Sequence, residues 1–201
     1  MARAFKRIIV LILCSLLCTV FFSCTGEKNG KSKLVEVMYS DYIAEAEYLF
    51  EVGESCVAGT MRITRDENVR IELLSPDPYT GICVTGDAAD NVSVLTISYS
   101  GVKAEIAKNV LSRLNLILAM FSDTASSAVD GAGKDAFTVC EDQYSESEVS
   151  GSVPYEVQFS IGDAQCVYIY DSTSGKLLDM RAVSGDTSVQ IKIKKLKTAE
   201  Q

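Results

Sequence analysis

The chain has 201 residues, with 27 acidic and 19 basic side chains, a formal charge of −8, and neither histidine nor tryptophan. Without histidine there is no Ser-His-Asp or Cys-His nucleophile system, no imidazole metal site and no imidazole that titrates near neutral pH. A surface this acidic does not bind nucleic acid by neutralising its phosphates, so nucleic acid is excluded as a partner.

The first 23 residues have the three parts of a secretory signal peptide. Arg3, Lys6 and Arg7 precede an apolar run over 8–22, and the small Ser23 stands before Cys24. The run is shorter than the about 20 apolar residues that cross a bilayer as a helix. It resembles a bacterial lipoprotein signal peptide, in which the cysteine receives acyl chains such as palmitate and becomes the new N-terminus. Cys24 is therefore the predicted site of lipid attachment, with plain secretion or an uncleaved membrane anchor as alternatives.

We expect three parts along the chain: a lipoprotein signal peptide over 1–23, a polar tether over 24–33 and one domain over 34–201. The tether is rich in Gly, Lys, Glu and Asn, and it is expected to hold the domain off the membrane without packing against it. A chain lipidated at Cys24 would be exported and anchored to the bacterial cell membrane or envelope.

Most of the domain alternates apolar and polar residues with a period of two, which is typical of strands with one buried face. Ala44, Ala46 and Tyr48, for example, alternate with Glu45 and Glu47. The predicted strands cover residues 44–52, 57–64, 69–73, 82–85, 92–99, 102–106, 136–140, 155–161, 166–170, 177–182 and 189–196.

Three segments carry further signals. Over 109–121 apolar residues recur every three or four positions, which predicts an amphipathic helix. The Ser-, Ala- and Gly-rich segment 122–134 is expected to be a mobile loop or a ragged helix end, and it is the candidate for a lid. In the last strand Lys192 and Lys194 alternate with apolar residues, which favours an exposed edge strand protected from pairing.

These elements define a mainly β, α+β fold class. About ten antiparallel strands with one or two helices are incompatible with a parallel βαβ fold. We expect a curved antiparallel sheet, an open half-barrel whose concave face is capped by the helix and the segment after it.

The cysteines outside the signal peptide and Cys24 are Cys56, Cys83, Cys140 and Cys166. Four cysteines in an exported domain allow three disulfide pairings. Their spacing contains no CxxC motif, which argues against a zinc ribbon or a redox pair. Because each lies in or beside an apolar run, small buried hydrophobic residues are slightly favoured over disulfides.

No motif indicates catalysis or a cofactor. Glu45, Glu47 and Glu51 alternate with core positions, which is typical of a solvated strand face. Glycine-rich phosphate loops and a Gly-x-Ser-x-Gly nucleophile motif are absent from the sequence. We therefore expect no enzyme, no cofactor and no metal site, with a carboxylate-dependent hydrolase as the weakest alternative.

Aromatic and aliphatic residues on the predicted strand and helix faces are the candidates for a ligand site. A half-closed sheet with one helix has more concave apolar surface than that helix covers, and an apolar ligand would bind in such a concavity. The candidate cavity residues are Tyr48, Phe50, Met61, Ile71, Ile97, Tyr99, Leu114, Leu118, Phe121, Tyr168 and Tyr170.

Two predicted strand pairs have a further pattern: GTMRIT and VRIELLSP over 59–76, and YIYD followed by GKLLDM over 168–180. These pairs resemble those of the LolA/LolB-type lipoprotein carrier superfamily. The resemblance implies an open eleven-stranded half-barrel, capped by helices, that holds acyl chains. The family's full N-terminal amphipathic helix has a counterpart here only over 34–42, and a lipidated chain would be an anchored receptor or lipid holder.

The leading hypothesis is a membrane-anchored exported lipoprotein that binds a lipid or an acylated protein in the concave face. The alternative is a non-enzymatic envelope sensor or interaction module, with a fully packed sheet, that binds a protein partner along an edge.

Overall fold

The structure is a computed structural model and describes residues 25–88, 94–107, 112–140 and 154–198. The helices are α2 (Thr25–Tyr39), α3 (Ser112–Ala119), α4 (Asp123–Gly131) and the short 3₁₀ helix η2 (Lys134–Ala136). The strands are β1 (Tyr42–Val52), β2 (Ser55–Arg65), β3 (Asn68–Leu73), β4 (Cys83–Asp87), β5 (Val94–Tyr99), β6 (Val102–Ala107), β7 (Phe137–Val139), β8 (Pro154–Ile161), β9 (Ala164–Asp171), β10 (Leu177–Ser184) and β11 (Thr187–Thr198).

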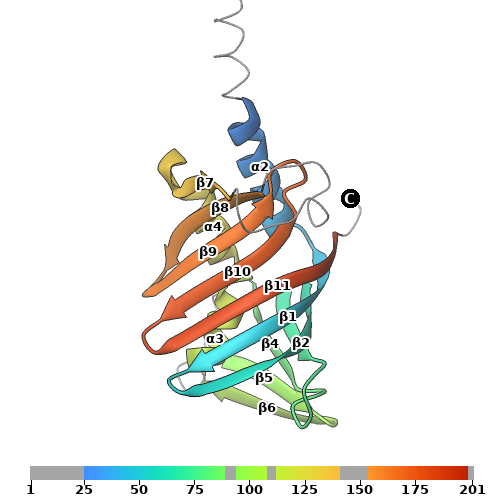
Figure 1. Cartoon of the computed structure of the whole chain (residues 1–201). Helices are drawn as coiled ribbons and strands as arrows, with labels where there is room; N and C mark the ends of the chain where they lie inside the picture. Colours follow the sequence, from blue (N-terminus) through green and yellow to red (C-terminus); the bar gives the residue numbers. More distant parts are fainter. Residues whose placement is uncertain (1–24, 89–93, 108–111, 141–153, 199–201) are drawn as a thin grey trace, which may run out of the picture.

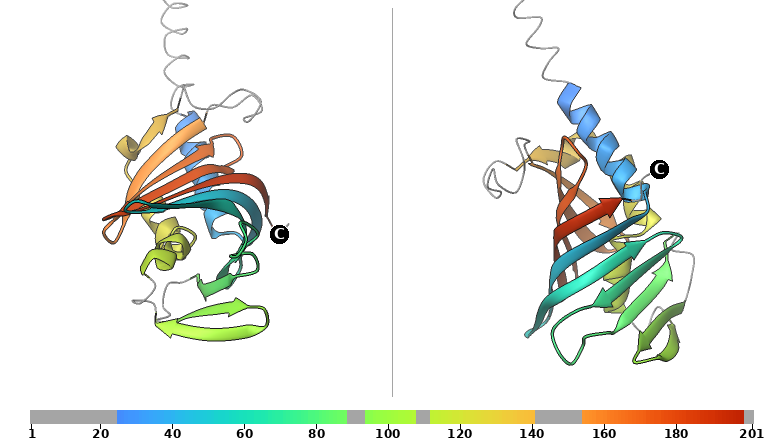
Figure 2. Two further views of the ribbon diagram at one scale, coloured as in Figure 1. Left: turned by 60° about the horizontal axis from the view of Figure 1, so that its bottom comes forward. Right: turned by 90° about the vertical axis from the view of Figure 1, so that its right-hand side faces the viewer.

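All these strands belong to one 11-stranded sheet with the order β6-β5-β4-β3-β2-β1-β11-β10-β9-β8-β7. Each neighbouring pair is antiparallel, and β1 beside β11 joins the N-terminal strands to the C-terminal ones. Figures 1 and 2 show that the open sheet curves around the helices on its concave side. The predicted fold class, a mainly β open half-barrel capped by helices, is confirmed.

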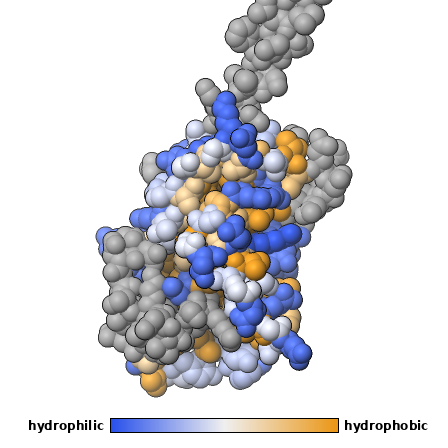
Figure 3. Space-filling view, turned by 90° about the vertical axis from the view of Figure 1, so that its left-hand side faces the viewer, coloured by the Kyte–Doolittle hydropathy of each residue, from blue (hydrophilic) through white to orange (hydrophobic). Residues whose placement is uncertain are grey.

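The period of two in the sequence produces the two faces of the sheet. In β1, Ala44, Ala46 and Tyr48 are buried toward the helices, whereas Glu45 and Glu47 face away from them. The buried side chains of α2, α3, α4 and the concave strand faces form one hydrophobic core. On the side of the molecule drawn in Figure 3, hydrophilic residues lie between small groups of hydrophobic ones, as expected for a surface in water.

The edge-strand prediction for the last strand is wrong. β11 is paired on both sides, with β1 and with β10, and lies in the middle of the sheet. Its lysines lie on the convex face, where Lys194 pairs with Glu47 at 2.9 Å and Lys195 with Glu45 at 2.9 Å. Alternating lysines therefore mark a solvated face of a central strand here, and the carboxylates of β1 neutralise them.

The helix predicted over 109–121 is present as α3, and residues 108–111 lie outside the described ranges. The segment after it forms a separate regular helix, α4, over most of 122–134, where we expected a mobile loop or a ragged helix end. The buried residues of α4 are Ala125, Ser126 and Val129. Small side chains let this helix pack closely, but they give a weak hydrophobic signal in the sequence.

The polar segment 25–33 is also helical, because α2 begins at Thr25. The prediction of an unpacked tether therefore differs from the structure. Leu34 and Met38 of α2 are buried, at 0% and 4% exposure, and burying such side chains contributes about 1.5–3 kcal/mol each. The polar residues before them pack through a glycine backbone and lysine side chains, contacts that hydropathy does not reveal.

All four cysteines of the domain are free thiols. Cys83 and Cys166 are buried, as the preferred interpretation predicted, and Cys140 is half-buried. Cys56 is exposed, so that interpretation is wrong for it.

Candidate functional site

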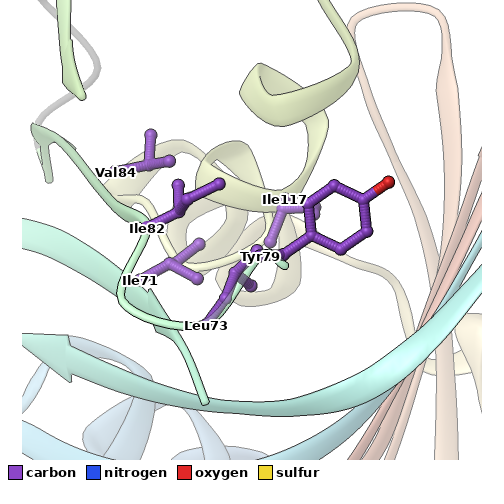
Figure 4. A pocket seen from close by; sticks show the side chains of 6 residues that line it. All are labelled: Ile71, Leu73, Tyr79, Ile82, Val84 and Ile117. Carbon is purple, nitrogen blue, oxygen red and sulfur yellow. The ribbon is translucent and has the colours of Figure 1, made fainter. Parts of the chain in front are cut away.

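An apolar pocket of about 220 Å³ lies on the concave side of the sheet, between β3, β4 and α3. Figure 4 shows the side chains that line it: Ile71, Leu73, Tyr79, Ile82, Val84 and Ile117. Ile71 and Val84 are cross-strand partners, and Ile117 approaches them from α3. Tyr79 is 42% exposed, and its hydroxyl points away from the aliphatic side chains, so it forms the rim.

The loop 74–82, which carries Tyr79 and Ile82, is held against β2. The amides of Leu74 and Ser75 donate to the carbonyl of Thr60 at 2.8 and 3.2 Å, and the Thr60 amide donates to Ser75 Oγ at 2.9 Å. Gly59 permits this approach, because a Cβ at that position would lie 2.2 Å from the carbonyl oxygen of Ser75. The loop is thus fixed at its start.

The size of the pocket limits what it holds. At about 220 Å³ it is larger than the ~150 Å³ apolar cavity that takes up benzene. It is smaller than the about 300–1,000 Å³ of pockets that enclose a drug-sized ligand. The pocket has room for the end of an apolar chain or for one ring, with the rest of the ligand outside it.

The concave face under β9–β11 is densely packed. Tyr168, Met180 and Ile191 are each 0% exposed. The Tyr168 hydroxyl donates to the carbonyl of Met120 at 2.6 Å, and the Phe159 ring packs edge-on against Tyr168 with centroids 4.7 Å apart. Burial raises the pKa of the Tyr168 hydroxyl well above its ordinary value of 10.0, so it remains a donor.

Arg65 fixes the corner between α3 and α4. It is 4% exposed, and its guanidinium donates to the carbonyls of Phe121 and Ser40, each at 3.0 Å. It also forms an ion pair with Asp123, the first residue of α4. Three partners satisfy the buried charge and connect the end of β2 to the residues that follow α2 and α3 and to the start of α4.

The structure distributes the residues predicted to line a cavity over several environments. Ile71 lines the pocket. The residues buried in the core are Tyr48, Met61, Leu118, Phe121, Tyr168 and Tyr170. Phe50 and Ile97 are half-buried and pack against that core, whereas Tyr99 is 49% exposed at the β5–β6 turn. The side chain of Leu114 lies outside the described residues.

Sequence reasoning missed five pocket residues: Leu73, Tyr79, Ile82, Val84 and Ile117. Leu73, Ile82 and Val84 belong to runs predicted as strands and could have been found by pairing those strands. Ile117 lies on α3 three residues after Leu114 and four before Phe121, so the spacing of the predicted apolar stripe could also have selected it. Tyr79 follows Pro78 in a loop, where no periodicity applies.

The convex carboxylates are placed for ion pairing. A hydrogen bond from Lys195, together with its charge, lowers the pKa of Glu45 below its ordinary value, with Arg62 adding to the effect. A general acid needs the opposite shift. Within the ranges that the structure describes, no group of three or more acidic or cysteine side chains is placed to hold a metal ion. The same ranges contain no helix long and apolar enough to span a membrane.

The fold and pocket define an open half-barrel with an apolar site on its concave side. The structure is similar to a LolA superfamily protein from Nitrosomonas europaea, with 8% identity, 87% of this chain and 94% of that chain covered, and a TM-score of 0.44. It is also similar to a putative outer membrane lipoprotein-sorting protein domain from Vibrio parahaemolyticus (14% identity, 87% and 93% covered, TM-score 0.40) and to LprF from Mycobacterium bovis (9%, 88% and 94%, TM-score 0.41).

These neighbours include proteins of the superfamily that two strand pairs of the sequence resemble. No family model and no curated protein matches the sequence. At identities of 8–14% these likenesses do not identify a ligand.

Proposed function

We propose that this protein is an exported, membrane-anchored lipoprotein that binds the acyl chain of a lipid or of an acylated protein, without catalysing a reaction. The observation that carries the proposal is the apolar pocket between β3, β4 and α3, whose aliphatic lining side chains offer an apolar end group a surface to pack against. Each methylene transferred from water into it contributes about 0.8 kcal/mol. A chain end of several methylenes would bind measurably, with the polar head left in water beyond Tyr79.

The anchor is the second part of the proposal. Residues 1–23 would be removed as a signal peptide, and Cys24 would carry the lipid. This part rests on the sequence: a basic start, an apolar run and a small residue before Cys24. Two or more acyl chains on one cysteine give stable attachment, whereas one chain gives marginal attachment.

A protein-binding envelope sensor is the alternative. It is favoured by the sheet edges, because β6 and β7 each pair on one side only within the described part of the chain. Such an edge can accept a strand from a partner.

Binding of a fluorescent fatty acid to the purified protein tests the pocket. Val84→Phe places a ring in the pocket and should weaken binding at least about tenfold, the effect of losing roughly 1.4 kcal/mol of contacts. Val183→Phe is the matched control, because Val183 is 50% exposed on β10. Equal binding by both variants, with unchanged folding, would contradict the proposed pocket.

The anchor is tested separately with Cys24→Ser. This variant should lose its acyl mass and leave the membrane fraction, while the pocket of the released domain still binds the fatty acid. Native mass spectrometry of the wild-type chain extracted from membranes should show a co-purifying lipid. If the serine variant keeps its membrane attachment, lipidation at Cys24 is refuted.

A further inference from the structure

Helix α2 is fixed to the domain from its sixth residue onward. Gly30 lies against the β9–β10 turn, where a Cβ on the glycine would be 3.2 Å from Ser172. The Lys31 ammonium donates to the carbonyls of Asp130 and Ala132 at 2.6 and 2.9 Å, and lies 5.4 Å from the centre of the Phe137 ring. The helix is therefore attached both to the end of α4 and to the edge of the sheet.

The next turn of α2 is packed more closely. Gly175 has a φ of +74°, and a Cβ there would lie 2.4 Å from the carbonyl carbon of Lys33. The Lys33 ammonium donates to the carbonyl of Thr173 in the same turn. Farther along, Ser126 Oγ donates to the carbonyl of Met38 at 3.2 Å, and Leu34 is fully buried. Backbone-to-backbone contact of this kind leaves the helix no freedom to swing.

This attachment sets how far the domain can stand from a lipidated Cys24. Gly30 lies six positions after Cys24 in the sequence, so that six residues from 25 to 30 bridge the distance. Even fully extended they span about 20 Å, and as a continuation of the helix about 9 Å. A flexible tether of the kind the composition suggested would need residues 30–33 as well, and these are held by the domain.

The pocket lies at the other end of the molecule. Figure 1 and both views of Figure 2 show α2 starting at one end, beside the β9–β10 turn, and β4, β5 and β6 at the opposite end with α3 next to them. Ile71, Val84 and Ile117 belong to that second end. The sequence 25–33 also carries three lysines and one glutamate, so the segment that starts α2 is basic in an acidic chain. Lysines beside a bilayer are attracted to its anionic lipids.

We infer that α2 is a rigid stalk that turns the pocket away from the bilayer holding the lipidated Cys24, so that the pocket takes its apolar ligand from outside that bilayer. This inference rests on the proposed function for both the anchor and the ligand. An extended tether would instead allow the domain to tip and reach lipids of its own membrane. The stalk makes the protein an acceptor that faces outward.

Energy transfer from a single tryptophan to dansyl-labelled lipid tests the orientation, because the natural chain has no tryptophan. The full lipidated chain is reconstituted into vesicles that contain the labelled lipid. Thr173→Trp places the donor in the exposed β9–β10 turn, and Tyr99→Trp places it in the β5–β6 turn at the pocket end. We expect transfer several-fold stronger from position 173 than from position 99.

A linker variant is the control. About 20 Gly and Ser residues inserted between Cys24 and Thr25 have a root-mean-square span of about 25 Å and should remove most of the difference between the two positions. Equal transfer from both positions in the chain without the insertion, or stronger transfer from position 99, overturns the inference. A chain that does not stay on the vesicles overturns it together with the anchor. Failure to bind a fatty acid refutes the proposed pocket but leaves the orientation measurement intact.

Discussion

The two halves of the concave face differ in how fully they are covered. Under β9–β11, side chains such as Tyr168 and Met180 have no exposed surface, and α2 and α4 pack together on that side, with α4 reaching β8. Under β3 and β4 the helix cover is α3, and Leu73 and Ile82 are half-buried beside a pocket. Strands of the same alternation thus form a closed core in one half and a ligand-sized space in the other, and helix cover makes the difference.

Truncating one large side chain in each half should separate them most clearly. Tyr168→Ala should lower the free energy of unfolding by about 3–5 kcal/mol, because it leaves a cavity and an unpaired Met120 carbonyl. Leu73→Ala, at the edge of an existing space, should cost only about 1–2 kcal/mol. Urea unfolding measures both, with Tyr168→Phe as the control for the hydroxyl alone. Equal costs would mean that the two halves are packed alike.

Detaching α2 should open the closed half. Gly175→Ala combines a positive φ with contact against the Lys33 backbone, and should cost about 2–4 kcal/mol of unfolding free energy. Gly185→Ala has a similar φ of +58° with no atom within 4 Å, and should cost only the about 1–2 kcal/mol of left-handed backbone strain. Hydrogen exchange should show faster exchange in α2 for Gly175→Ala alone. If the two variants behave alike, the close packing of α2 does not stabilise the closed half.

The sequence predicted the parts of this comparison unevenly. Period-two alternation located the strands, because burial of one sheet face imposes it on each strand separately. The order of the strands did not follow from this alternation. Lys192 and Lys194 suggested an edge strand, whereas the glutamates that face such lysines lie on β1, far away in the sequence. Which strand pairs with which is a long-range property that local patterning does not contain.

The helices and the pocket show the same limit. The large apolar residues of α3 predict a helix, whereas α4 buries the small Ala125, Ser126 and Val129, and its sequence predicts no more than a mobile loop or a ragged helix end. The polar start of α2 packs through Gly30, Lys31 and Lys33, whose contacts depend on the position of a distant turn. The pocket exists where α3 covers the sheet only in part, so its lining could not be selected from the apolar residues alone.

Alkaline pH should weaken the closed half. Burial raises the pKa of the Cys166 thiol from its ordinary value of 9.0 to about 11. Between these two pH values the folded state keeps the thiol proton, whereas the unfolded chain loses it. The protonated thiol contributes its full stabilisation at pH values below the ordinary pKa of 9.0, and this stabilisation is lost as the pH rises through the folded-state pKa of about 11. The urea midpoint should fall over this interval, and it should fall less in Cys166→Ala. A midpoint that does not change with pH would show that this thiol is not desolvated.

The ion pairs of the convex face should contribute least to stability. They join β1 to β11 in the middle of the sheet, so they do not stabilise one half more than the other. Lys194 and Glu47 are joined at 2.9 Å, but both side chains are about half exposed, at 44% and 54%. Exposed pairs of this kind contribute about 0–1 kcal/mol. Lys194→Ala should therefore change the free energy of unfolding by less than about 1 kcal/mol and leave fatty-acid binding unchanged, with Glu47→Ala as the matched partner.

Aggregation of Lys194→Ala, measured by light scattering, would instead support the edge-protecting role that the alternating lysines first suggested. A strand hydrogen-bonded on both sides has no edge to protect, so we expect this variant to stay monomeric wherever the wild type does.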